Sequence, residues 1–87
     1  MPKRKGRLNL EIVRSNIAEA IEELQKLEDH ASTGDLHEEE LQVGLCHAYH
    51  HLNFAWNIRR VATREYANLS KTQFDEWGRY PSDIEQL

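Results

Sequence analysis

Cysteine, proline and glycine are all scarce in this chain of 87 residues. Cys46 is the single cysteine, so no intrachain disulfide can form and a disulfide-stapled scaffold is excluded. Neither proline interrupts the interval 3–80, and no alternating β-branched run or Asn-Gly turn indicates a strand. No apolar run approaches the ~20 residues that a membrane-spanning helix requires. These absences leave a single small domain of the all-α class as the expected fold.

Positive charge is concentrated at the start of the chain. Residues 1–7 carry four basic side chains, whereas residues 8–50 carry two basic and ten acidic ones, within a net charge of −4. An acidic body disfavours nucleic-acid binding, which needs clustered Lys and Arg. We expect residues 1–8 to be a flexible basic arm, with contact to RNA or DNA as the less favoured alternative. The lone cysteine, and the lack of an apolar segment after the basic start, predict a cytoplasmic protein.

Apolar residues recur every three or four positions near the start of the chain, which predicts an amphipathic helix over about 9–31. Asn9 is a suitable N-cap, and Gly34 lies where a helix commonly ends in the left-handed conformation. A second helix is predicted over about 35–67, begun by a capping box of Asp35 and Glu38. Because the link is so short, the two helices should form an antiparallel hairpin.

A third, short helix is predicted over about 70–78. Ser70 and Gln73 form a capping box, and Gly78 marks the end. Residues 9–87 are therefore expected to form one helical domain.

The second predicted helix has two apolar faces. A seam of small residues that includes Gly44 suggests that the first helix packs closely there. A hairpin can cover only one face, so the other should meet a partner, and the simplest solution is a homodimeric four-helix bundle. The face expected against the first helix holds Leu41, Leu45, Ala48, Leu52, Ala55, Ala62 and Tyr66, and the expected contact stripe holds Val43, His47, His50, Phe54 and Val61.

Three histidines lie within five residues of the second helix. His47 and His51 are four positions apart and project from one side, a spacing that can chelate a divalent transition metal. A third ligand would have to come from Glu23, Asn16 or a second subunit. The favoured interpretation is that His47 and His51 border the helix–helix seam and hydrogen-bond to neighbouring groups.

No motif of a known catalytic site is present in the sequence, so no catalytic residue is predicted and a non-enzymatic role is favoured. The sequence predicts a homodimeric protein-interaction module that could also bind another protein. The alternative is a helical bundle that binds a metal or small ligand through His47, His50 and His51.

Overall fold

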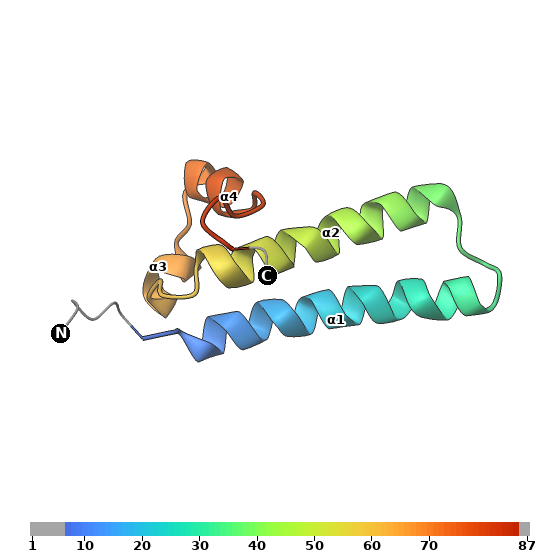
Figure 1. The fold of residues 1–87 in the computed structure, drawn as a ribbon, viewed down its shortest axis with the longest axis horizontal. Helices are drawn as coiled ribbons and strands as arrows, with labels where there is room; N and C mark the ends of the chain where they lie inside the picture. The colour runs from blue at the N-terminus through green and yellow to red at the C-terminus, as the bar shows by residue number, and fades with distance from the viewer. Residues whose placement is uncertain (1–6, 86–87) are drawn as a thin grey trace.

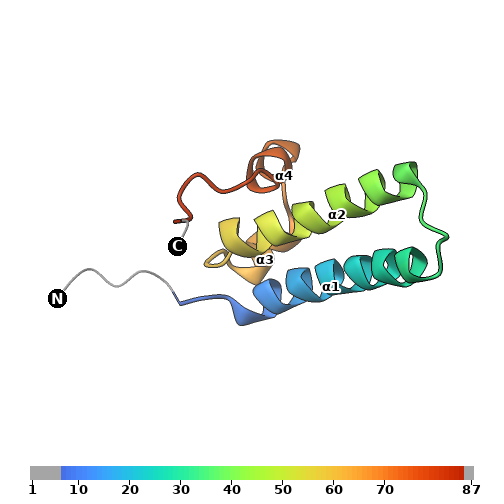
Figure 2. The ribbon, with the colours of Figure 1, turned by 45° about the vertical axis from the view of Figure 1, so that its right-hand side comes forward.

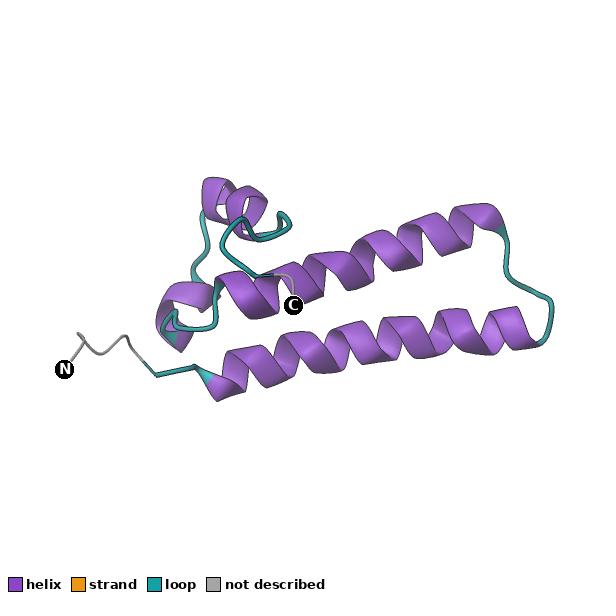
Figure 3. Ribbon diagram, in the orientation of Figure 1, coloured by secondary structure: helices purple, strands orange, loops and turns teal. Residues whose placement is uncertain are grey.

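The computed structural model describes residues 7–85, and this part of the chain contains four helices and no strand (Figure 1, Figure 3). Helix α1 spans Leu10–Ser32, α2 spans Glu38–Asn57, α3 spans Thr63–Ala67 and α4 spans Lys71–Trp77. The molecule is elongated, 54 × 31 × 22 Å, because α1 and α2 lie side by side as an antiparallel hairpin. The all-α class and the long hairpin are thus confirmed. Most of the predicted basic arm lies outside the described residues.

The ends of α1 follow the predicted signals. The Asn9 side chain accepts from the backbone N–H of Ile12, as expected of an N-cap. At the other end Gly34 has a φ of 78°, the backbone N–H of Asp35 donates to the His30 carbonyl (2.8 Å), and that of Gly34 donates to Ala31 (3.2 Å). This pair of bonds is the Schellman arrangement, which closes a helix whose next residue is left-handed.

Helix α2 begins later than predicted. Its N-cap is His37, which makes no side-chain capping bond, so the expected cap at Asp35 is wrong. The reason lies in the preceding turn, where the backbone of Asp35 completes the end of α1. The first turn of α2 instead relies on three successive glutamates, whose charge is favourable beside the positive end of the helix dipole.

Helix α2 also ends earlier than predicted, so a continuous helix over 35–67 is wrong. The helix stops at Asn57, residues 58–60 form a turn, and α3 follows after a short gap. Two carbonyls at this break accept hydrogen bonds from Asn9. The Asn9 backbone N–H donates to the carbonyl of Arg59 (2.6 Å), and the Asn9 side-chain amide donates to the carbonyl of Val61 (2.8 Å). Ile58 is fully buried at this turn. Burial of Ile58 and the bonds to Asn9 therefore outweigh continuation of the helix.

The core lies where α1 begins and α2 ends, which we call the closed end of the hairpin; the opposite end, at the connection 33–37, is the turn end. Ile12, Phe54 and Ile58 form the buried cluster of the closed end. Four partly buried residues from the C-terminal third pack against this cluster: Val61, Tyr66, Leu69 and Trp77.

The predicted short helix is confirmed as α4, with the capping box of Ser70 and Gln73 at its start. It lies on the side of α2 that faces away from α1 (Figure 1, Figure 2). The Asn57 side chain donates to the carbonyls of Trp77 (2.7 Å) and Arg79 (2.9 Å), and Asn53 donates to Gly78 (2.8 Å). These two asparagines of α2 therefore fix the position of α4.

Fewer residues of α2 face α1 than the sequence predicted. A β-carbon at Gly44 would lie 2.7 Å from Leu27 Cδ2, which confirms that α1 packs closely against this glycine. Ala20 and Ala48 are also buried, whereas Leu41 and Leu52, which were expected to face α1, are exposed. Small residues thus set the distance between the helices, and the leucines lie to one side of the seam. No helix in the described part of the chain is long and apolar enough to cross a membrane.

Candidate functional site

A groove of about 790 Å³ runs along α2 beneath the C-terminal segment. It forms because α3 and α4 cover only the last part of the second face of α2. Its walls combine apolar side chains with all three histidines of the cluster: Glu39, Gln42, Val43, Cys46, His47, His50, His51, Phe54, Tyr66, Leu69 and Phe74.

His50 forms an aromatic part of this groove. Its ring centroid lies 4.7 Å from that of Phe54 and 4.6 Å from that of Phe74. Its Nε2 atom is buried and has no hydrogen-bond partner within the described part of the chain. Burial, and then the charges of His51 and His47, lower the pKa of His50. His50 therefore behaves as a neutral aromatic wall near neutral pH.

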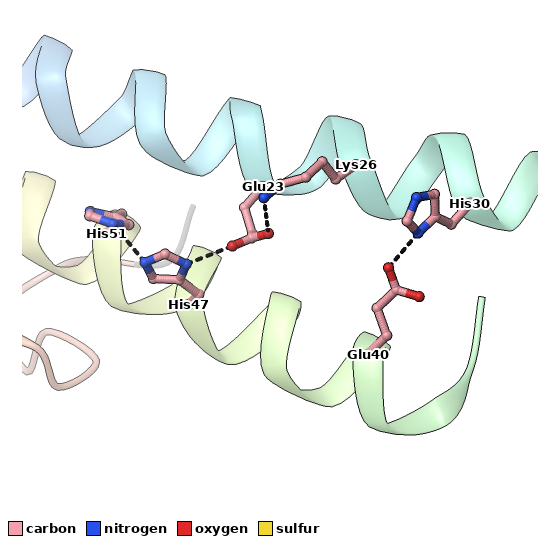
Figure 4. Close-up of polar contacts among 6 residues, drawn as sticks. All are labelled: Glu23, Lys26, His30, Glu40, His47 and His51. Carbon is pink, nitrogen blue, oxygen red and sulfur yellow. Dashed lines mark hydrogen bonds and ion pairs between the residues drawn. The ribbon is translucent and has the colours of Figure 1, made fainter. Parts of the chain in front are cut away.

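His47 is anchored to α1 by a carboxylate. Its Nδ1 lies 2.6 Å from Glu23 Oε1, and the other oxygen of Glu23 lies 3.5 Å from Lys26 Nζ (Figure 4). Since a carboxylate oxygen accepts, His47 Nδ1 carries the proton of this bond. The bond to His47 holds the pKa of Glu23 below its usual value, which keeps the carboxylate charged.

His51 is anchored to α1 by a buried amide. Its Nδ1 lies 2.9 Å from Asn16 Oδ1, and Asn16 is only 1% exposed. The Asn16 amide group donates to the Ile12 carbonyl (3.0 Å), which requires the amide oxygen to face the histidine. His51 Nδ1 is therefore also a donor. Burial, and then the charge of His47, lower the pKa of His51, so its neutral form is favoured.

The two anchored rings meet at their remaining nitrogens. His47 Nε2 lies 3.2 Å from His51 Nε2, and the ring centroids are 4.8 Å apart. Figure 4 shows the resulting row from Glu23 through His47 to His51. A separate pair, His30 with Glu40, joins the helices nearer the turn end. The seam interpretation of His47 and His51 is consistent with these bonds. Glu23 and Asn16, which the sequence offered as possible further ligands, are the groups that contact the two rings.

The C-terminal tail is held at the outside of α2. The Trp56 indole N–H donates to Asp83 (2.9 Å), and the Arg59 guanidinium lies 3.8 Å from the Trp56 ring centroid and 3.4 Å from Asp83. The bond from Trp56, followed by the interaction with Arg59, holds the pKa of Asp83 below its usual value. This arrangement fixes the tail and leaves the groove on the other side of α2 uncovered.

The predicted contact stripe divides into two parts. Val43 is 69% exposed and His47 is also exposed, so a contact role for them stays a prediction. Phe54 is only 3% exposed and Val61 packs on the core, so their own chain covers both of them. His50 is half-buried beneath α4. The C-terminal segment thus takes the place that a partner was expected to fill over the closed end.

Sequence reasoning missed a second surface, which we call the apolar flank. It consists of large apolar side chains, five of them exposed and Leu45 half-buried, beside the seam on both long helices: Ile17, Ile21 and Leu24 of α1, and Leu41, Leu45 and Leu52 of α2. The row Gly44, Ala48 and Ala55 was the signal that could have revealed it. If those small residues mark the seam, the neighbouring leucines must lie outside it.

Comparison with known proteins gives no match: no protein-family model, no curated protein and no solved structure is similar to this chain.

Proposed function

We propose that this protein is a homodimeric interaction module in which two helical hairpins associate through their apolar flanks into a four-helix bundle. The observation that carries the proposal is the exposure of a row of large apolar residues on both long helices. Ile21 is 60% exposed, and Ile17, Leu24 and Leu52 are each at least 40% exposed. Contiguous apolar surface of this kind typically marks an interface.

Helix geometry places both rows on one side of the hairpin. Ile17 and Ile21 each follow a buried seam residue of α1 by one position, and Leu45 follows Gly44 of α2 in the same way. One position is a rotation of about 100°. Because the two right-handed helices run antiparallel, a step of one residue beyond the seam turns the side chain toward the same side of the hairpin in both helices. Glu11 lies one position before a buried seam residue and therefore faces the opposite side of the hairpin. There its carboxylate accepts a hydrogen bond from the hydroxyl of Thr63 in α3.

The size of the apolar flank suits a second copy of the chain. Helix α1 has 23 residues, which gives a length of ~34 Å. Two helices each ~10 Å wide make a face of roughly 700 Å², close to the ~800 Å² per partner of a stable complex.

The small core of the single chain supports the same proposal. In the described part of the chain, the buried hydrophobic residues are only Ile12, Ala20, Leu27, Ala48, Phe54 and Ile58. Small domains with so little buried apolar surface are commonly stabilised by association. A copy seated on the apolar flank would give both long helices a second buried side.

The test compares one charge on each side of the hairpin. We expect the wild-type protein to sediment as a dimer across the micromolar range. Ile21→Asp should give a folded monomer, because a carboxylate buried at an interface is unfavourable. The matched variant Val43→Asp, at a similarly exposed residue on the wall of the groove, should stay dimeric. Circular dichroism checks that both variants remain helical.

A wild-type monomer throughout that concentration range would contradict the proposal. Dissociation by Val43→Asp together with a dimeric Ile21→Asp variant would also contradict it, and would place the contact on the groove side.

A further inference from the structure

The two anchored histidines bring their Nε2 atoms close together. Both Nδ1 atoms are donors, to Glu23 Oε1 for His47 and to Asn16 Oδ1 for His51. A neutral imidazole has one donor and one acceptor nitrogen, so in the neutral rings both Nε2 atoms carry lone pairs. These atoms lie 3.2 Å apart. Two facing lone pairs at that distance repel unless a positive centre lies beside both of them.

We propose that His47 and His51 bind a divalent transition-metal ion through their Nε2 atoms. A tetrahedral ion with metal–nitrogen bonds of about 2.0–2.1 Å separates its ligand nitrogens by about 3.3 Å. The observed 3.2 Å therefore matches the edge of such a site. The spacing of four residues on one helix, confirmed within α2, brings both rings to the same side.

The bonds at Nδ1 are those expected around a metal-binding histidine. Such a histidine usually donates its other ring N–H to a carboxylate or an amide oxygen, which fixes the tautomer and the ring orientation. Glu23 supplies the carboxylate, and Asn16 supplies an amide that is itself held by the Ile12 carbonyl. Helix α1 therefore orients both rings, and the seam that packs the hairpin also fixes the separation of the two Nε2 atoms.

Charge and access favour a cation at this point. The Glu23 carboxylate lies 2.6 Å from His47 Nδ1, and Glu19 also acts electrostatically on His51. The His47 side chain is 55% exposed, so an ion can reach Nε2 from the groove. Imidazole ligands favour Zn²⁺, Cu²⁺ and Ni²⁺ over the harder Mg²⁺ and Ca²⁺.

The protein supplies two ligands to this site. No group of three or more His, Cys, Asp or Glu side chains suited to one ion is found within residues 7–85. His50 does not contribute, since its ring packs against both Phe54 and Phe74. Water completes the coordination, so the bound ion is exchangeable. The site lies on the opposite side of the hairpin from the apolar flank, and the inference does not rest on dimer formation.

The test is calorimetric titration of untagged protein with Zn²⁺ near neutral pH. We expect one ion per chain for the wild-type protein. His47→Ala removes an exposed side chain and should weaken binding at least tenfold while the helical signal is retained. His51→Ala should weaken binding similarly. The matched control is His37→Ala, which removes an exposed histidine outside the groove and should bind Zn²⁺ as the wild type does.

Two further measurements separate the site from general affinity for cations. Glu23→Gln keeps a hydrogen-bond acceptor but removes the charge behind His47, and should weaken binding about tenfold. Cu²⁺ added to the wild type should give an electron paramagnetic resonance spectrum with coupling to nitrogen, and His47→Ala should lose one of the coupled nitrogens.

Equal Zn²⁺ affinity in the wild type and His47→Ala would overturn the inference. Absence of Zn²⁺ binding by the folded wild-type protein would overturn it too, and would indicate that a shared proton joins the two rings. Neither result depends on the oligomeric state measured for Ile21→Asp, so the metal site and the dimer can fail separately.

Discussion

The two ends of the hairpin are held together by different forces. At the closed end, Ile12, Phe54 and Ile58 form a buried cluster covered by the C-terminal segment, and Asn9 bonds the turn that follows α2. At the turn end, Leu27 packs on Gly44, and the remaining link is the exposed pair of His30 and Glu40. Exposed ion pairs contribute little to stability, whereas buried aromatic and aliphatic side chains contribute kilocalories. Most of the folding free energy of one chain therefore resides at the closed end.

The largest effect is expected when the central aromatic ring of the closed end is removed. Phe54→Ala deletes a side chain that is 3% exposed. Truncation of a buried Phe costs about 3–5 kcal/mol, which approaches the whole stability of a small domain. We expect the variant to be largely unfolded, as measured by urea denaturation followed by circular dichroism. Val43→Ala, an apolar truncation at an exposed residue, should change stability by less than about 0.5 kcal/mol.

A smaller effect is expected in the seam toward the turn end. Gly44→Ala gains about 1 kcal/mol of helix propensity, but the new β-carbon meets the buried Leu27 side chain at 2.7 Å. Overpacking costs about 1–3 kcal/mol, so we expect a net destabilisation of about 1 kcal/mol.

A second substitution tests the cause of that loss. Leu27→Ala removes the obstructing atoms, so the double variant with Gly44→Ala should be more stable than the sum of the two single effects. Simple additivity in this double-mutant cycle would show that Leu27 does not limit the approach of the helices.

The smallest expected effect is a pH dependence that originates in the groove. The pKa of His50 is lowered in the folded state by burial and by the charges of His51 and His47, with Asp75 acting in the opposite direction. The unfolded chain therefore binds a proton more readily than the folded chain. Stability should be complete above the unfolded pKa of about 6.5 and should fall as the pH is lowered toward the folded pKa.

His50→Phe checks this assignment, because it keeps an aromatic ring against Phe54 and Phe74 and removes the proton-binding site. Thermal unfolding midpoints at neutral and mildly acidic pH should differ less in this variant than in the wild type. Some dependence should remain, since the pKa of His51 is lowered as well. An unchanged pH dependence would place its origin outside His50.

Local signals predicted the parts of the fold that local forces decide. The limits of α1, the left-handed residue at Gly34 and the capping box at Ser70 depend on neighbouring residues alone. The break after Asn57 depends on contacts between segments far apart in the sequence, because burial of Ile58 and the bonds to Asn9 stabilise it. No proline or glycine marks that break, although the β-branched residues Ile58, Val61 and Thr63 lower the helix propensity there.

The candidate site was predictable to a similar degree. The pattern of α1 singled out Glu23 and Asn16 as side chains that could reach the histidines, and both contact them. The tautomers could not be inferred from the register, because they depend on how the buried Asn16 amide is oriented by Ile12. The position of the apolar flank was missed because Leu41, Leu45 and Leu52 were assigned to the face against α1 together with the small residues of the seam.

The bonds of Asn9 also indicate which parts of the hairpin form first during folding. They join residues 50 and 52 positions apart, whereas the Schellman turn joins residues no more than five apart. Closing a long loop costs more chain entropy than closing a short one. We therefore expect the hairpin to close from the turn end, and the bonds of Asn9 to form after the folding transition state. An interaction absent from the transition state governs the lifetime of the native chain and leaves its folding rate unchanged. The bonds of Asn9 are therefore expected to slow unfolding of the native chain.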